Sequence, residues 1–384
     1  MIYLDAAATT PVRREALEAM WPLLTSEFGN PSSRHGFGDA AARALAQARG
    51  ALARLLGVTD SGVVLTSGGT EAANLAIKGI ALAEPRGRHV IVSAVEHEAV
   101  LESADYLARH HGFAVDVLGV DRAGRVQPER LAEALRDDTT LVSVQYANNE
   151  VGTIQPVAEL ARVARARGAR LHTDAVQAAG WLPLDASALG VDAISVSGHK
   201  FGAPKGTGAL AVRAGVRLEP LLHGGGQERG ARSGTENVAG AVALAVAAGL
   251  AERERADGVE RVTRLRDLLM DGVREISPDA IVTGDPRQRL PGIASFCFPG
   301  VNGEAVLLGL EEREVYTSSG SACAAGRTDP SHVLLAMGYP AEVAHTAVRF
   351  SLAHTTTEDD VAGALAALER TLASLGRLDT RARP

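Results

Sequence analysis

The chain has 384 residues, of which 46% are apolar and 22% are charged, a composition typical of folded globular proteins rather than disordered ones. Its 39 basic and 46 acidic residues give a net charge of −7, which argues against direct nucleic-acid binding. The only cysteines, Cys297 and Cys323, exclude a disulfide framework and favour a reducing compartment, so we expect a cytoplasmic protein.

We expect neither a signal peptide nor a membrane span. The first residues lack a charged region followed by an apolar run, which a secretory signal requires. The longest apolar stretch, residues 238–251, is shorter than the roughly 20 residues that cross a bilayer, and it predicts a buried helix.

Strand and helix patterns alternate along the first half of the chain. Short β-rich runs separated by helices indicate an α/β fold with a mostly parallel sheet covered on both faces. The predicted strands are 63–66, 89–93, 113–120, 141–146, 169–173, 193–197 and 209–212, and the predicted helices are 39–56, 71–82, 99–110, 131–135 and 157–167.

Two long helices are predicted at 237–250 and 258–276, with the charged stretch 252–255 between them. The pattern then changes to a mixed α+β segment. We therefore predict a large domain over residues 14–256. Residues 1–13 and 257–384 are expected to form a smaller α+β domain.

Lysine is rare in this chain. It occurs only at Lys78, Lys200 and Lys205, and the other 36 of the 39 basic residues are arginine. Because guanidinium is a poor amine nucleophile, a retained lysine suggests a need for an amine, although chance retention explains it equally well. Lys200 directly follows an apolar strand, where burial lowers an ammonium pKa and frees the amine for Schiff-base formation. The alternative is that Lys200 extends from the strand end to solvent.

Two other strand ends carry candidate ligand-binding residues. Gly68 and Gly69 lie between a strand and a helix, and the helix N-terminus suits a phosphate, although a glycine turn with a helix cap gives the same pattern. Asp174 follows another predicted strand. It is either the N-cap of a helix or an anion that pairs with a protonated ring nitrogen.

Pyridoxal 5'-phosphate requires three things of a protein: a lysine that forms a Schiff base, an acid for its ring nitrogen and a site for its phosphate. The order of the three candidates in this chain resembles the fold-type I pyridoxal phosphate enzymes.

Further motifs narrow the resemblance. Together with the Asp174 and Lys200 segments, they resemble the cysteine desulfurases of the NifS/IscS-like group in the class-V aminotransferase superfamily. The matches are collinear from residue 3 to about residue 360. The motifs are 3–11 (YLDAAATTP), 28–33 (FGNPSS), 70–74 (TEAAN), 96–100 (EHEAV), 148–152 (NNEVG), 223–228 (HGGGQE), 232–235 (RSGT), 318–323 (SSGSAC) and 349–351 (RFS).

The resemblance implies a large domain with a mostly parallel seven-stranded sheet, a small domain that carries the catalytic cysteine, and a homodimer. It implies that Lys200 binds the cofactor covalently, and that His97 stacks on the ring and assists proton transfer. The implied phosphate contacts are Gly69, Thr70, Ser197 and His199, with Thr235 at the phosphate of the partner subunit. Asp174 and Gln177 are implied to contact the ring. Asn149 and Arg349 are implied to bind the substrate carboxylate, and Asn149 also belongs to the implied cofactor-binding residues.

Cys323 lies in a run of small residues, where an exposed thiol can form a thiolate and carry sulfur, although a chance loop cysteine is the simpler alternative. The resemblance implies that Cys323 takes sulfur from L-cysteine as a persulfide, leaves L-alanine, and passes sulfur to acceptor proteins such as an iron–sulfur scaffold. Cys297 is expected to be a buried strand thiol, and no permanent metal site is indicated.

Other activities remain open at this stage. A selenocysteine lyase or a related aminotransferase on the same fold is the nearest alternative. A nucleotide-binding oxidoreductase would leave Lys200 unexplained and lacks a Gly-x-Gly-x-x-Gly fingerprint, and a non-catalytic scaffold would be colourless.

Overall fold

The computed structural model describes residues 1–83, 86–320 and 329–381, with side chains described up to residue 376. Its largest sheet has the strand order β2-β8-β7-β6-β5-β3-β4. The strands from β7 to β4 pair in parallel, whereas β8 is antiparallel to both of its neighbours. This confirms the predicted seven-stranded, mostly parallel sheet. The strands are β2 (Val63–Thr66), β3 (His89–Ser93), β4 (Ala114–Leu118), β5 (Thr139–Ser143), β6 (Arg170–Asp174), β7 (Ala193–Ser197) and β8 (Gly208–Val212).

Helices cover both faces of this sheet because side chains along a strand point alternately to its two sides. Val90 and Val92 of β3 pack in a core with α3 and α5, and Ile91 packs in the opposite core with α2, α7 and α9. The helices of this part are α1 (Arg14–Thr25), α2 (Gly36–Leu56), α3 (Gly69–Asn74), α4 (Ile80–Ala83), α5 (Glu98–His111), α6 (Pro128–Ala134), α7 (Val157–Ala166), α8 (Ala186–Leu189) and α9 (Val238–Ile276).

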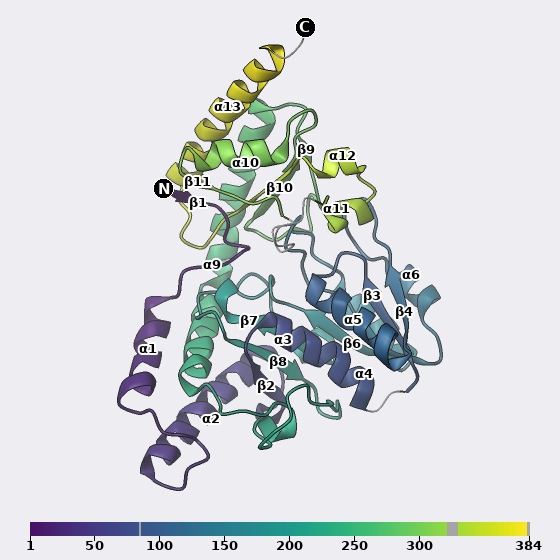
Figure 1. The fold of residues 1–384 in the computed structure, drawn as a ribbon, viewed down its shortest axis with the longest axis vertical. Coiled ribbons are helices and arrows are strands. Elements are labelled where there is room, and N and C mark those ends of the chain that lie inside the picture. Colours follow the sequence, from purple (N-terminus) through teal and green to yellow (C-terminus); the bar gives the residue numbers. More distant parts are fainter. Residues whose placement is uncertain (84–85, 321–328, 382–384) are drawn as a thin grey trace.

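A long helix, α9, passes from the first sheet to the second part of the molecule (Figure 1). The two helices predicted at 237–250 and 258–276 are therefore one continuous helix. Glu and Arg are good helix formers, and Glu252 pairs with Arg255 one turn away, so the charged stretch continues the helix instead of breaking it. The first half of α9 packs in the core of the large sheet, and residues 262–273 pack in a second core.

The second part contains a small antiparallel sheet of order β12-β10-β9, which packs against helices. Phe296 and Phe350 from adjacent strands meet at the centre of its core. The elements are β9 (Ile281–Val282), β10 (Ile293–Cys297), α10 (Gly303–Glu311), β11 (Val315–Tyr316), α11 (His332–Ala336), α12 (Ala341–Ala344), β12 (Ala347–Ser351) and α13 (Glu358–Arg381).

The first residues of the chain join this second part. Strand β1 (Ile2–Tyr3) pairs in parallel with β11, and Leu4 is buried in the second core. Residues 7–13 then run back to the first sheet, where Thr10 and Arg13 donate backbone hydrogen bonds to the carbonyls of His199 and Gly202. The segment therefore spans both parts. The predicted boundary near residue 256 lies inside α9 and stays a prediction.

Helix α1 is absent from the sequence-based prediction. Its apolar residues do recur at helical spacing, at Leu17, Trp21 and Leu24, but these side chains are exposed and only Ala16 of the helix is buried. In the described ranges no helix has both the length and the apolar character that a membrane crossing needs.

Candidate active site

Side chains at the carboxyl ends of the large sheet converge on one cavity of about 270 Å³, at the edge where open α/β sheets bind ligands. Most of the predicted site residues line this cavity, and Gln145 and Gly320 line it with them. The predicted residues brought together here are Gly69, Thr70, His97, Asn149, Asp174, Gln177, Ser197, His199, Lys200 and Arg349.

One end of the cavity is formed by the turn from β2 into α3. Gly68 has φ +154°, a conformation that strongly favours glycine. A Cβ on Gly69 would lie 2.8 Å from Val176 Cγ2 and 3.2 Å from Ser197 Cβ, so a side chain does not fit there. The turn therefore exposes the backbone at the start of α3 beside the hydroxyl groups of Thr70 and Ser197, an arrangement suited to an anion.

Asp174 is buried at the end of β6 with only 8% of its surface exposed. Its Oδ1 accepts a hydrogen bond of 2.9 Å from the Val176 amide. Burial raises the pKa of this carboxyl, and the Val176 hydrogen bond and the charges of His97 and Lys200 oppose the shift. A cation placed against Asp174 would therefore stabilise its ionised form.

His97 is the N-cap of α5. Its Nδ1 accepts a 3.0 Å hydrogen bond from the Ala99 amide, so the proton of the neutral ring lies on Nε2. The helix-cap role and the predicted role in the cavity are thus compatible. The cap fixes the imidazole on one side, and Nε2 is left as the proton-carrying atom.

Lys200 and His199 lie in a short 3₁₀ turn that directly follows β7. Lys200 Nζ donates to the carbonyls of Ala7 at 2.6 Å and Ala8 at 2.9 Å, so the N-terminal segment holds the amine at the cavity. Burial and the nearby cations Lys200 and Lys205 lower the pKa of His199 to about 4. His199 is therefore neutral at pH 7 and offers an N–H donor rather than a positive charge.

Arg349 is buried in β12 and reaches the cavity from the second part of the molecule. Its Nη2 donates to Asp5 Oδ1 at 2.7 Å, and its Nη1 donates to the Asn149 carbonyl at 2.9 Å. Within the described part of the chain, Arg349 Nε has no hydrogen-bond partner. A buried guanidinium with a spare donor can bind a carboxylate.

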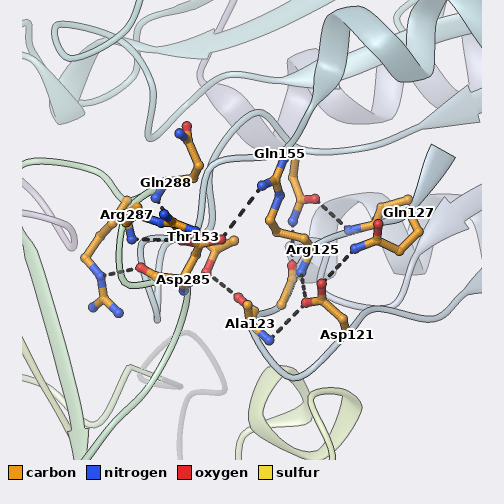
Figure 2. A network of polar contacts seen from close by, with 12 residues as sticks. Asp121, Ala123, Arg125, Gln127, Thr153, Gln155, Asp285, Arg287 and Gln288 are labelled. Atoms are coloured by element: carbon orange, nitrogen blue, oxygen red, sulfur yellow. Dashed lines mark hydrogen bonds and ion pairs between the residues drawn. The ribbon is translucent and has the colours of Figure 1, made fainter.

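The turn that carries Asn149 is held from two sides. Thr153 Oγ1 donates to the Ala123 carbonyl at 2.6 Å and accepts from the Asp285 amide at 2.9 Å. Figure 2 shows Thr153 between these two loops, with Asp121 and Asp285 each accepting hydrogen bonds within its own loop. This network fixes the turn 147–154 against both parts of the molecule.

Among the predicted residues that the structure describes, Thr235 does not line this cavity. Thr235 lines a separate cavity of about 210 Å³ with Ser67 and Arg232. Cys323, the predicted nucleophile, lies outside the described residues. Cys297 is fully buried in β10 as predicted, and burial raises the pKa of its thiol to about 11, which keeps it protonated.

A larger cavity of about 370 Å³ shares Ala7, Gln177 and Lys200 with the first. Trp181 and His354, stacked with ring centroids 3.9 Å apart, form part of its wall. We place the active site in the smaller cavity because Asp174 and Arg349 line that one.

Sequence reasoning assigned no role to Asp5, Glu96 or Glu150, although each lies in a motif that it singled out. Asp5 binds Arg349, whereas Glu96 and Glu150 are buried acids beside the cavity. Acidic residues are rarely buried, so the local sequence shows neither the burial of these two acids nor their partners. Among the described residues, no cluster of three or more His, Cys, Asp or Glu side chains could hold a metal ion.

Comparisons with known proteins extend over nearly the whole chain. The family model for class-V aminotransferases matches residues 2–363. The cysteine desulfurase IscS of Dictyoglomus turgidum is 46% identical over 375 residues, which are 97% of this chain and 95% of that protein. The cysteine desulfurase NifS of Azotobacter vinelandii is 47% identical over 361 residues, covering 94% and 90% of the two chains.

Solved structures agree with these sequence comparisons. A NifS-like protein of 38% identity superposes with a TM-score of 0.91 over 97% of this chain and 100% of its own. SspA in complex with cysteine, at 36% identity, superposes with a TM-score of 0.81 over 92% of this chain and 99% of its own. The similarity therefore includes both parts of the fold.

Proposed function

The chain belongs to the class-V aminotransferase family, and from this we propose that it is a cysteine desulfurase, which removes sulfur from L-cysteine and leaves L-alanine. The observation that carries the proposal is the single cavity that joins Lys200, Asp174 and Arg349. An amine, a buried acid and a buried guanidinium are the groups that cofactor-dependent chemistry on an amino acid requires.

Family membership implies dependence on pyridoxal phosphate, and the cavity fits this cofactor. Gly69 leaves no space for a side chain, so the phosphate would approach the backbone there, with Thr70, Ser197 and His199 as further donors. The ring nitrogen would give buried Asp174 a cationic partner, and Gln177 and His97 would contact the ring. When bound, the cofactor supplies an aldehyde that condenses with amines and a ring that takes up the electron pair of the Cα–H bond.

The side chains of this protein bind and orient the substrate. Arg349 would bind the substrate carboxylate with Asn149 beside it, while Asp5 keeps the guanidinium in place. His97 would hold and move a proton at Nε2, because its Nδ1 is engaged by the Ala99 amide. The amine of Lys200, held by the carbonyls of Ala7 and Ala8, would carry the cofactor.

We assign the sulfur transfer to Cys323. Its thiolate attacks the substrate sulfur, so that an S–S bond forms while the substrate Cβ–S bond breaks. The electron pair of the broken bond stays on carbon and takes a proton to give the methyl group of alanine. One enzyme thiol and one cysteine thus yield one enzyme persulfide and one alanine, and no external oxidant is needed.

The proposed enzyme acts as a cytoplasmic homodimer and passes sulfur to acceptor proteins such as an iron–sulfur scaffold. Thr235 lies away from the cavity of its own chain, which supports the role at the phosphate of a second subunit that the sequence predicts. The exposed apolar residues of α1, of the segment after it and of the first turn of α2 support a buried interface there, and we call them the α1 apolar surface. Its members are Leu17, Trp21, Leu24, Phe28 and Phe37.

The proposal is tested with two variants of the purified enzyme. The wild type is expected to show the visible absorbance of pyridoxal phosphate bound to a lysine, and Lys200→Ala is expected to lose it. Cys323→Ser should keep the absorbance but form no persulfide with cysteine. Persulfide at the wild-type rate in Cys323→Ser would refute the role of this residue, and activity with selenocysteine alone would favour the lyase alternative.

A further inference from the structure

Thr153 is a fully buried residue to which the proposed mechanism gives no role. It closes the turn 147–154, because the Asn148 amide donates to its backbone carbonyl at 3.0 Å. Its hydroxyl group has two partners outside the turn, the Ala123 carbonyl at 2.6 Å and the Asp285 amide at 2.9 Å (Figure 2). Thr153 therefore joins this turn to one loop from each part of the molecule.

The proposed site for the substrate carboxylate is shared between the same two parts. Asn149 lies in the turn 147–154, whereas Arg349 lies in β12 of the second part, and both line the cavity. The two residues are in direct contact, because Arg349 Nη1 donates to the Asn149 carbonyl at 2.9 Å. Carboxylate binding by both side chains depends on a fixed spacing between them. The placement of the turn relative to β12 therefore matters for substrate binding.

The segment 283–290 of the second part pairs with the turn. Besides the bond from Asp285 to the Thr153 hydroxyl, two backbone hydrogen bonds of 2.8 Å join them. These run from the Ile154 amide to the Gln288 carbonyl and from the Leu290 amide to the Gly152 carbonyl.

The start of this segment binds the strand next to Arg349. Thr283 Oγ1 donates to Ser295 Oγ at 2.7 Å, and the Thr283 amide donates to the Ser295 carbonyl at 3.0 Å. Ser295 of β10 pairs directly with Arg349 of β12. A continuous path therefore leads from the Thr153 hydroxyl through Asp285, Thr283 and Ser295 to Arg349.

A threonine hydroxyl suits this junction because it donates and accepts at the same time. Valine has nearly the same shape but can do neither. In Thr153→Val the Ala123 carbonyl and the Asp285 amide would lose a buried partner, which is costly, and they regain partners only if the turn or the loops move. Thr153→Ser keeps the hydroxyl and is the conservative variant.

We propose that Thr153 is a positioning residue for the substrate carboxylate. Its hydroxyl fixes the spacing of Asn149 and Arg349 across the two parts of the molecule, although Thr153 itself does not line the cavity. The inference rests on the proposed function, because it takes Arg349 and Asn149 as the groups that bind the carboxylate.

The test compares two alkoxyamines that react with lysine-bound pyridoxal phosphate and remove its absorbance. Aminooxyacetate carries a carboxylate and methoxyamine does not, so the ratio of their second-order rate constants measures carboxylate recognition in the holoenzyme. We expect Thr153→Val to lower this ratio about tenfold, through slower reaction with aminooxyacetate alone. Thr153→Ser should stay within about threefold of the wild type.

Hydrogen exchange of the holoenzyme gives a readout that is independent of cofactor reactivity. Peptides that cover 121–127 and 283–290 should exchange faster in Thr153→Val than in the wild type, because the hydroxyl holds both loops. Unchanged exchange in both peptides would contradict the proposed role of the hydroxyl.

Thr371→Val is the matched control. Thr371 is as fully buried as Thr153, but within the described part of the chain its Oγ1 has no hydrogen-bond partner, so the wild-type ratio is expected. Thr283→Val breaks the other end of the path and should lower the ratio in the same direction, and it decides the question if Thr153→Val does not fold.

An unchanged ratio in Thr153→Val would overturn the inference, as would an equal loss of rate with both alkoxyamines. If Thr153→Val does not fold, an unchanged ratio in Thr283→Val has the same meaning. A wild type with the ratio of free pyridoxal phosphate would refute the carboxylate site and the inference with it. A wild type without the cofactor absorbance would instead refute the proposed function.

Discussion

Burial decides the protonation state of several side chains around the cavity. Glu96 is fully buried beside His97, and its Oε1 accepts hydrogen bonds from Ser93 Oγ at 2.6 Å and from the Gln145 amide at 2.7 Å. Desolvation raises the pKa of Glu96 to about 8, and desolvation lowers the pKa of buried His172 to about 3. At neutral pH, each group is therefore held mainly in its uncharged form.

The raised pKa of Glu96 predicts a pH-dependent stability. Because the folded state binds this proton more tightly than the unfolded state, the contribution of Glu96 is fully present below pH 4.5 and is lost as pH rises through about 8. We expect Glu96→Gln, which cannot ionise, to gain stability relative to the wild type by up to about 1.4 kcal/mol per pH unit over this window. Urea unfolding at pH 5, 6.5 and 8 measures it, and a difference that is constant with pH would contradict the expectation.

Among the elements, the strands of the large sheet were the most predictable, because their short apolar runs are bounded by glycine and polar residues. Strand β5 is the least accurate of them. It ends at Ser143, although the prediction continued to residue 146, because Val144 and Tyr146 donate only isolated backbone hydrogen bonds to β6. The two-residue strands β1, β9 and β11 are too short to carry a local pattern, and the partners of β1 and β11 lie more than 300 residues apart.

The turn from β2 to α3 gives a prediction for cofactor binding. Gly69→Ala would place a methyl group 2.8 Å from Val176 Cγ2, and overpacking of this kind costs about 1–3 kcal/mol. We therefore expect pyridoxal phosphate to bind about tenfold or more weakly to Gly69→Ala, measured by titrating the apoenzyme and following absorbance.

Gly36→Ala is the matched control for that experiment. Gly36 is the first residue of α2, and a Cβ there would meet nothing within 4 Å. It should bind the cofactor as the wild type does. Equal affinity in Gly69→Ala and the wild type would show that the turn does not hold the phosphate.

The site residues that could be predicted are those at the ends of strands, where open α/β sheets bind ligands. Asp174 is the last residue of β6 and Lys200 lies in the turn after β7, and both line the cavity. The ion pair of Asp5 with Arg349 was not predictable, because Asp5 follows β1, Arg349 lies within β12, and the two residues are 344 positions apart. Ser331 reaches Glu150 across 181 residues, so only the folded chain reveals that contact.

At the scale of the whole molecule, the α1 apolar surface is exposed on the single chain. Trp21 is 66% exposed and Phe28 is 68% exposed, values unusual for large apolar residues unless a partner covers them. If this surface is the homodimer interface, we expect Trp21 to contribute strongly to the binding free energy. Tryptophan is enriched among interface residues whose replacement by alanine weakens binding by about 2 kcal/mol or more.

We therefore expect Trp21→Glu to weaken the dimer by about thirtyfold or more, as measured by sedimentation across a concentration series. Leu308→Glu is the control, because Leu308 is 57% exposed on α10, outside that surface. A wild type that sediments as a monomer, or a Trp21→Glu variant as dimeric as the control, would remove this surface from the dimer interface.

The pairing of β1 with β11 also has a consequence for biosynthesis. Residues 2–3 leave the ribosome long before their partners at 315–316 are made, and the Arg349 partner of Asp5 is made later still. Contacts of such long sequence separation form slowly, because a large loop must close before they do. Ala7 also donates its amide to Ser351 Oγ, so the wall that Ala7 and Ala8 provide beside Lys200 is complete only after β12 has been made.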